Sequence, residues 1–232
     1  EVAEKNIDGT IVKSYYYKED SKRGKDALDI GVNSIKIFNE KFGKYPYPTY
    51  SVVETVFPSG MDYPGLLYII DGYYNTIASN DSLTIVVVHE TAHQWWYSLV
   101  GNDEIDEAWL DEGFAAYSES IYIENAFSPS RGKNYFKNDV EQWHDQVISQ
   151  HIIDGVVVKT LSDFKNWDDY GPTVYTRGAV TLNELRKKVG DEEFFQIMQE
   201  YYKEFQFKIA TTKDFIDVSK KVSGQNLDDF FN

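Results

Sequence analysis

The chain has 232 residues, of which 42% are hydrophobic, enough to bury the core of one large domain or two modest ones. Its net charge of −15 argues against a nucleic-acid surface, which requires clustered Lys and Arg, and no run of about 18 apolar residues is present to span a membrane. The absence of cysteine excludes disulfides and thiolate metal sites, so a metal ion would need His, Asp or Glu ligands.

The first hundred residues mix predicted strands with a predicted helix. Residues 7–18 are rich in β-branched and aromatic side chains around a glycine turn and predict strand. Residues 24–42 carry apolar side chains at helical spacing and end before Gly43, a typical helix C-cap. Residues 50–57 and 66–70 predict two strands joined by the turn-rich segment PSGMDYPG.

After residue 105 the pattern is helical almost throughout. Ser128 and Pro129 have the form of an N-cap followed by proline at the first helical position. Further helices are expected at residues 176–189, 191–205 and 212–222. The predicted fold class is therefore α+β, with a mixed sheet and helix half up to about residue 100 and a mostly helical half after it.

The segment HETAHQWW, residues 89–96, raises the question of whether residues 82–100 form a helix or a buried strand. In a helix, His89 and His93 lie about 40° apart on one face, and both imidazoles reach one metal ion. In a strand they would be about 13 Å apart, too far to share an ion. The β-branched run 84–88 opposes a helix by a few kcal/mol, whereas metal binding contributes on the order of 10 kcal/mol. A helix is therefore predicted.

A His-Glu-x-x-His motif also arises by chance, so a third ligand is needed to support a metal site. Glu90 lies roughly 60° from His93 in the predicted helix, beside the ligand face, where it can hold a water. Residues 106–117 predict a second helix, and its Glu112 flanks an apolar stripe. Glu112 would complete a set of two histidines and one glutamate with an open fourth position, the arrangement of catalytic zinc. The adjacent Gly113 predicts a close approach to another helix.

Several sequence blocks resemble one known family. His-Glu-x-x-His, then eighteen residues, then Glu is similar to the metal signature of the gluzincin zinc aminopeptidases, the family of aminopeptidase N. HETAHQWW resembles the family's HELAHQWF, and WLDEGFAAY resembles its WLNEGFA-Y. KFGKYPYP, SGMDYPG and VYTRGA resemble its FGxYPYP segment, its substrate-binding GAMEN strand and its YxKGA. The blocks follow the family order and cover most of residues 40–190.

The resemblance implies a thermolysin-like metallopeptidase catalytic domain that binds one Zn²⁺ per chain. Zinc would be held by His89, His93 and Glu112. Glu90 would be the general base that takes a proton from the zinc-bound water, and Tyr175 would donate a hydrogen bond to the oxyanion. The substrate would be the N-terminus of a peptide or protein, from which the first residue is removed.

The resemblance also implies a set of substrate-binding residues. Gly60 and Met61 would present their backbone to the peptide, Asp62 would bind its free α-amine, and Tyr170 would help to orient it. Asp62 is one methylene shorter than the glutamate of the family, so an endopeptidase stays open as an alternative. A zinc hydrolase of the same scaffold that acts on another bond also stays open, as does a relative that has lost catalysis and acts as a scaffold.

The expected domain organisation is that of a catalytic domain cut from a longer protein. Residues 1–20 would be a first strand or the tail of a preceding β domain, and residues 21–232 the catalytic domain, divided at about residue 100. The flanking domains usual in the family are not contained in this sequence. The composition is that of a soluble domain and leaves the compartment open between cytoplasmic and extracytoplasmic.

Overall fold

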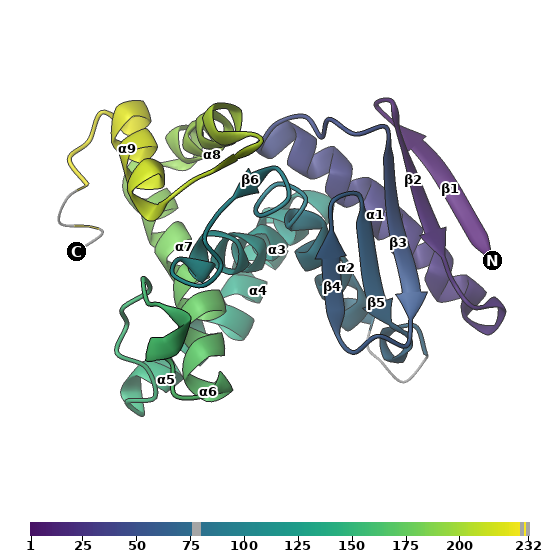
Figure 1. Ribbon diagram of the computed structural model, residues 1–232, viewed down its shortest axis with the longest axis horizontal. Helices are drawn as coiled ribbons and strands as arrows, with labels where there is room; N and C mark the ends of the chain where they lie inside the picture. The colour runs from purple at the N-terminus through teal and green to yellow at the C-terminus, as the bar shows by residue number, and fades with distance from the viewer. Residues whose placement is uncertain (76–79, 228–229, 231–232) are drawn as a thin grey trace.

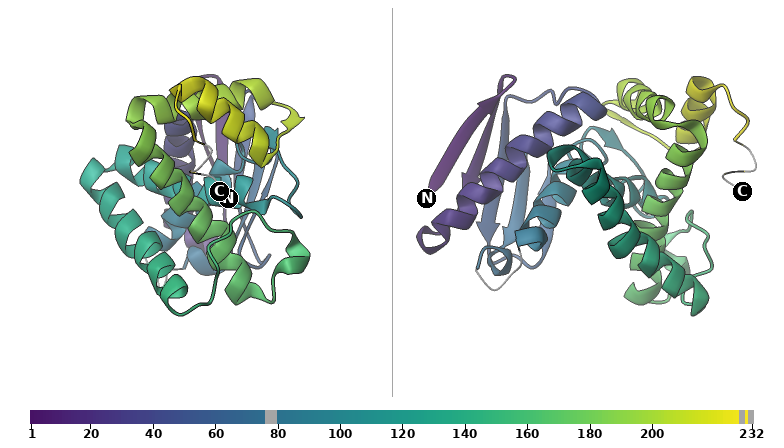
Figure 2. Two further views of the ribbon diagram at one scale, coloured as in Figure 1. Left: turned by 90° about the vertical axis from the view of Figure 1, so that its left-hand side faces the viewer. Right: turned by 180° about the vertical axis from the view of Figure 1, so that it is seen from behind.

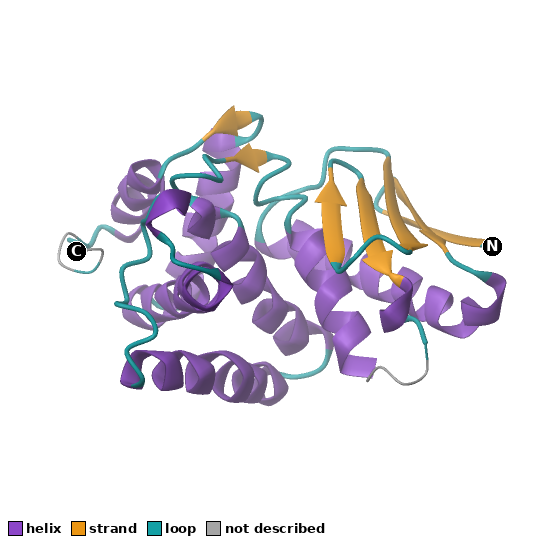
Figure 3. Cartoon of the chain, turned by 60° about the horizontal axis from the view of Figure 1, so that its bottom comes forward, coloured by secondary structure: helices purple, strands orange, loops and turns teal. Residues whose placement is uncertain are grey.

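The computed structural model describes residues 1–75, 80–227 and 230. A sheet with two long helices forms one side of the molecule, and a group of helices forms the other (Figures 1 and 3). The mixed first part and helical second part follow each other in sequence, as the sequence predicted. The exact domain boundaries stay a prediction.

The first part is built on a five-stranded sheet with the order β1-β2-β3-β5-β4. The central strands β2, β3 and β5 are parallel, and the edge strands β1 and β4 are antiparallel to their neighbours. The strands are β1 (Val2–Ile7), β2 (Thr10–Tyr15), β3 (Thr49–Thr55), β4 (Gly60–Tyr63) and β5 (Leu66–Ile70).

Two details of this sheet differ from the sequence prediction. Residues 7–18 are not one strand: Asp8 and Gly9 both have positive φ and close a hairpin between β1 and β2. The segment assigned to a turn by composition contains β4, which pairs with β5 through the register Gly60↔Ile69. The turn between β4 and β5 is the Pro64-Gly65 pair, with Gly65 at φ +79°, and Ser59, at φ +68°, belongs to the bend just before β4.

Two helices pack on the sheet and on each other. Helix α1 (Ser21–Lys41) runs across one face of the sheet, as Figure 2 shows from behind, and buries Ala27, Leu28, Ile35 and Phe38. Helix α2 (Asn80–Ala92) carries the metal-ligand motif. The β-branched run is helical, because Val87 and Val88 are fully buried in the core and their burial outweighs their modest helix penalty.

Helix α2 ends at Ala92, eight residues before the predicted end at residue 100. His93 keeps the helical hydrogen bond of its backbone N–H to the His89 carbonyl, at 3.3 Å. The chain then turns through Tyr97, whose φ is +118°, and reaches the short strand β6 (Val100–Gly101). The turn buries both tryptophans: Trp95 packs on Phe38 and Phe42 of the α1 end, and Trp96 packs on Phe114 and Tyr201.

The second part consists of helices and one short strand, β7 (Lys208–Ile209), which pairs with β6. Its helices are α3 (Glu112–Ala126), α4 (Pro129–Tyr135), α5 (Gln142–Ser149), α6 (Trp167–Gly171), α7 (Gly178–Val189), α8 (Asp191–Phe205) and α9 (Thr212–Ser223). Two π-helical turns, Phe136–Glu141 and Pro172–Arg177, join neighbouring helices. Within the described residues, no helix combines the length and apolar character needed to cross a membrane.

Helix α3 begins at Glu112, later than the predicted start at residue 106. A 3₁₀ turn, Ala108–Leu110, precedes it, and the Asp111 carboxylate accepts a hydrogen bond from the Glu112 N–H at 2.6 Å. The predicted close approach at Gly113 is present. A β-carbon added at Gly113 would lie 2.9 Å from the Cα of Gly178, the first residue of α7.

Gly113→Ala is expected to lower the free energy of unfolding by about 1–3 kcal/mol, because its methyl group would overpack the contact with the α7 backbone. Gly72→Ala is the matched control, since a β-carbon there would meet no atom within 4 Å. Chemical denaturation followed by tryptophan fluorescence measures both variants. Equal midpoints for the two would contradict the proposed packing constraint.

Candidate active site

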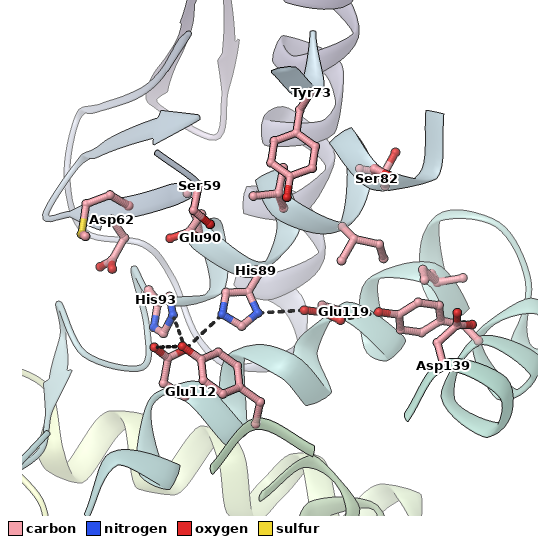
Figure 4. Close-up of a pocket in the computed structure, with 18 of the residues that line it drawn as sticks. Ser59, Asp62, Tyr73, Ser82, His89, Glu90, His93, Glu112, Glu119 and Asp139 are labelled. Carbon is pink, nitrogen blue, oxygen red and sulfur yellow. Dashed lines mark hydrogen bonds and ion pairs between the residues drawn. The ribbon is translucent and has the colours of Figure 1, made fainter. Parts of the chain in front are cut away.

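A cavity of about 1030 Å³ lies where the sheet meets the helical part. Its walls come from β4, the turn after β5, α2, α3 with the turn after it, α4, α6 and the Phe136–Glu141 and Pro172–Arg177 turns. Most of the residues singled out from the sequence line it: Gly60, Met61, Asp62, His89, Glu90, His93, Glu112 and Tyr175. Figure 4 shows His89, His93 and Glu112 at its centre, with Asp62 on one side and Glu119 on the other.

The two histidines and Glu112 converge on one point. Glu112 Oε2 lies 3.1 Å from His89 Nε2 and 3.2 Å from His93 Nε2. Their nitrogen and oxygen atoms all lie within 4.8 Å of one another. The helical spacing puts both imidazoles on one face of α2, and the late start of α3 puts Glu112 at the end that faces them. Two imidazoles and one carboxylate form a donor set suited to a divalent ion such as Zn²⁺.

The other ring nitrogen of each histidine is also engaged. His89 Nδ1 lies 2.7 Å from Glu119 Oε1, and His93 Nδ1 lies 3.1 Å from the Trp96 carbonyl oxygen. Each acceptor takes the Nδ1 hydrogen, so the neutral form of each ring, the form that binds a metal ion, would carry its lone pair on Nε2, the nitrogen nearest Glu112. Such contacts fix the tautomer and the orientation of metal-binding histidines.

Glu119 was missed by the sequence reasoning, although a signal for it exists. It follows Glu112 by two helical turns, so both carboxylates lie on the same face of α3. Its second oxygen accepts a short hydrogen bond from the Tyr135 hydroxyl of α4. Burial and the Glu119 charge raise the pKa of Tyr135 far above its usual value, which keeps the phenol protonated as the donor.

The charges of the cluster depend on one another. Burial alone would lower the pKa of His93, but the Glu112 carboxylate outweighs it and raises that pKa to about 9. The pKa of His89 is raised in the same way by Glu112 and Glu119 against the effect of burial. Burial would raise the pKa of Glu112, but the two histidines together hold it well below its usual range. Glu112 is therefore ionised and is positioned to neutralise a cation.

Glu90 lies on the same helix beside the ligand face, buried against β4. A β-carbon added at Gly60 would lie 2.1 Å from Glu90 Oε1, so a side chain at this position would displace the Glu90 carboxylate. Burial raises the pKa of Glu90, and the charges of Asp62 and Glu112 add to that rise against the two histidines. A carboxylate with a raised pKa is better matched to moving a proton near neutral pH.

Asp62 extends from β4 toward the cluster. Its carboxylate, that of Glu90 and the His93 ring have oxygen and nitrogen atoms within 4.8 Å of one another. Burial raises the pKa of Asp62, and the nearby Glu112 charge raises it further. Asp62 Oδ2 is buried and accepts no hydrogen bond from the described residues. A buried carboxylate oxygen without a donor is a site for a cationic or hydrogen-bond-donating group of a ligand.

The two predicted tyrosines lie at different depths. The Tyr175 hydroxyl donates to Glu112 Oε1 at 2.6 Å, and its ring stacks on His89 with centroids 5.8 Å apart. Tyr170 is not part of the cavity lining; it packs behind Tyr175 with ring centroids 6.2 Å apart. Direct contact of Tyr170 with a substrate stays a prediction, and its observed ring contacts are with Phe164, Trp167 and Tyr175.

Comparisons with known proteins agree with this geometry. Residues 26–232 match the profile of the peptidase family M1 domain. Aminopeptidase M1-B of Oryza sativa subsp. japonica is 28% identical over 96% of the chain, which spans 26% of that relative. Aminopeptidase 2, mitochondrial, of Saccharomyces cerevisiae is 30% identical over 95% of the chain, which spans 24% of it.

Solved structures share the fold. A variant of the M1 zinc metallopeptidase from Deinococcus radiodurans superposes with a TM-score of 0.71 at 19% identity and matches all of this chain. The chain spans 51% of that structure. It thus has about a quarter of the length of these curated relatives and about half that of the solved structure.

Glu119→Gln is expected to weaken Zn²⁺ binding by about 10- to 100-fold, because the amide is a weaker acceptor for the His89 Nδ1 hydrogen. Competition with a chromogenic chelator measures the affinity without reference to activity. The control is Glu192→Gln, an exposed position at the start of α8. An affinity equal to that of the control would remove Glu119 from the metal site.

Proposed function

This chain belongs to peptidase family M1, and we propose that its cavity is the active site of a zinc-dependent aminopeptidase that removes N-terminal residues from peptides. The observation that carries the proposal is the convergence of His89, His93 and Glu112 in a cavity that also contains the carboxylates of Glu90 and Asp62. The curated relatives that cover most of the chain are named aminopeptidases, and the similar solved structures are described as zinc metallopeptidases.

The residues fit a zinc ion. His89 and His93 would supply Nε2, and Glu112 would supply Oε2, the oxygen that both imidazoles already face. The fixed Nδ1 contacts favour the tautomers that zinc requires. Zinc bound there would lower the pKa of a water ligand to about 7 and polarise the substrate carbonyl.

Glu90 would act as the general base. Its carboxylate would accept a proton from the attacking water and pass it to the nitrogen of the leaving peptide. Its burial and raised pKa support the first half of this role, because a carboxylate with a raised pKa is a stronger base. The leaving nitrogen becomes more basic as its bond to the carbonyl carbon breaks, so the carboxylic acid can then donate the proton to it. The lack of a side chain at Gly60 in β4 leaves room for this carboxylate beside the cavity.

Tyr175 and Asp62 would bind the two ends of the substrate's first residue. The Tyr175 phenol keeps its proton, because burial and the Glu112 charge raise its pKa far above the usual value. It would donate that hydrogen to the carbonyl oxygen as negative charge develops there. Asp62, with its unsatisfied oxygen, would accept a hydrogen bond from the protonated α-amine. Gly60 and Met61 would offer backbone groups beside it.

Three competing functions differ in what they require of this site. A scaffold protein without catalytic activity would not need Glu90 and Tyr175 beside a set of metal ligands. Their presence in one cavity argues against that function. An endopeptidase has no free amine to place at Asp62 and would leave its buried oxygen without a partner. A zinc hydrolase of another bond would keep the dependence on Glu90 but show no dependence on a free α-amine.

Glu90→Gln is expected to retain zinc and to lower kcat by about 10²–10⁴-fold, because an amide can hydrogen-bond a water but cannot take its proton. Hydrolysis of aminoacyl anilides, together with metal analysis of the same preparations, checks both halves. His93→Ala is the contrasting variant and should lose both zinc and activity. Near-normal turnover by Glu90→Gln would assign the base to another group.

Asp62→Ala is expected to reduce kcat/KM for peptides with a free N-terminus by about tenfold or more, because a charge-assisted hydrogen bond to the amine is lost. N-acetylated peptides should be hydrolysed slowly by the wild type and little affected by the change. Asp62→Glu is the matched control and should keep the preference. An equal loss on both peptide classes would remove the amine-binding role and favour an endopeptidase.

A further inference from the structure

One aromatic side chain at the cavity is exposed far beyond what folding needs. Trp167 begins α6, lines the cavity and has 68% of its surface exposed. Phe127, just after α3, also lines the cavity and is 51% exposed, but the Arg131 guanidinium lies over its ring at 4.1 Å from the centroid. Trp143 of α5 is exposed as well and lies outside the cavity lining. A single exposed indole on a protein surface is common and does not indicate a binding site. An indole on the wall of the proposed active-site cavity offers an apolar face to a bound substrate.

The indole is ordered although it is exposed. Its ring lies 5.5 Å from the Tyr170 ring and 6.0 Å from the Tyr175 ring, centroid to centroid. Tyr170 in turn packs edge-on against Phe164 at 5.0 Å. The indole also folds back over Gly171, where an added β-carbon would lie 3.5 Å from two of its ring atoms. A group that is already held loses little conformational entropy when a ligand packs on it.

The position of Trp167 relates to one residue of the substrate. On the proposed function, Asp62 binds the α-amine of the first residue and Tyr175 binds its carbonyl oxygen. Only the α-carbon and the carbonyl carbon separate those two groups, so the side chain of the same residue branches off close to Tyr175. The Trp167 ring, 6.0 Å from the Tyr175 ring between centroids, is an apolar surface beside Tyr175 in the cavity.

The side of the cavity away from Asp62 carries two further carboxylates. Figure 4 shows Glu119 and Asp139 across the metal-ligand cluster from Asp62. The departing part of the peptide, which lies beyond the scissile bond, would extend toward that side. On this orientation Tyr175 meets the carbonyl of the first residue, so the wall beside Tyr175 is next to that residue.

We propose that Trp167 is a specificity-determining residue: its indole receives the side chain of the N-terminal residue and favours peptides that begin with an aromatic residue. The inference rests on the proposed function, because it takes the substrate orientation from Asp62 and Tyr175. Tyr170 contributes by supporting the indole and Tyr175 from behind, which gives it a role without direct contact with the substrate.

The test compares phenylalanyl and alanyl anilides on the wild type, Trp167→Ala, Trp167→Phe and the control Trp143→Ala. Trp167→Ala is expected to lower the ratio of kcat/KM for the phenylalanyl substrate over the alanyl substrate by about tenfold, because it removes an aromatic contact and its buried area. Trp167→Phe should keep most of the ratio, and Trp143→Ala all of it. Equal losses on both substrates, or an unchanged ratio, would overturn the proposal.

A binding measurement separates this inference from the proposed function. Calorimetry in the Glu90→Gln background measures the affinity for L-phenylalaninamide and L-alaninamide, with Trp167 present and replaced by alanine. A preference for the phenylalanine amide that is lost with Trp167→Ala supports the inference even if no anilide is hydrolysed, an outcome that would count against the proposed function alone. Equal binding of the two amides, or no binding of either, overturns the inference.

Discussion

The contact on which the site depends is the one that the Glu112 carboxylate makes with two imidazoles of another helix. It joins α3 to α2, and so joins the helical part to the sheet part. The contact requires α3 to begin at Glu112, with its first turn capped by Asp111, and requires α7 to approach closely at Gly178. The aromatic packing of Trp96 against Phe114 holds the same two segments together from the core side.

The cavity concentrates negative charge at a density that folding alone would disfavour. Asp62, Glu90, Glu112 and Glu119 face two histidines, and burial raises the pKa of both Asp62 and Glu90. Such groups are stable together only when hydrogen bonds or cations offset their repulsion. A metal ion at the histidines and an ammonium group at Asp62 are two cations of the right kind, so the ligands of the proposed reaction also relieve the electrostatic cost of its site.

Much of the site was predictable because its information is local in sequence. Helical periodicity fixes His89 and His93 on one face whatever the rest of the chain does, and a glycine inside a helix, Gly113, indicated the helix contact. The end of α2 at Ala92 was not predictable, because it follows from the burial of Trp95 and Trp96 against distant elements. The β4 strand was hidden for a similar reason: its residues favour turns, and only the pairing with β5 makes them a strand.

The position of Tyr170 shows that a sequence motif does not determine which of its side chains reach the cavity. The sequence brings Tyr170 and Tyr175 within two helical turns, and a resemblance assigns both to the substrate. The Pro172–Arg177 π-turn between α6 and α7 instead puts one phenol on Glu112 and leaves the other behind it. Trp167 then occupies the exposed position in front of Tyr170. A preference for the first residue of a peptide would thus arise from the short α6 and its stacked rings. The proposed hydrolysis would depend on α2, α3 and Tyr175, so the two properties meet at the contact between the Trp167 and Tyr175 rings.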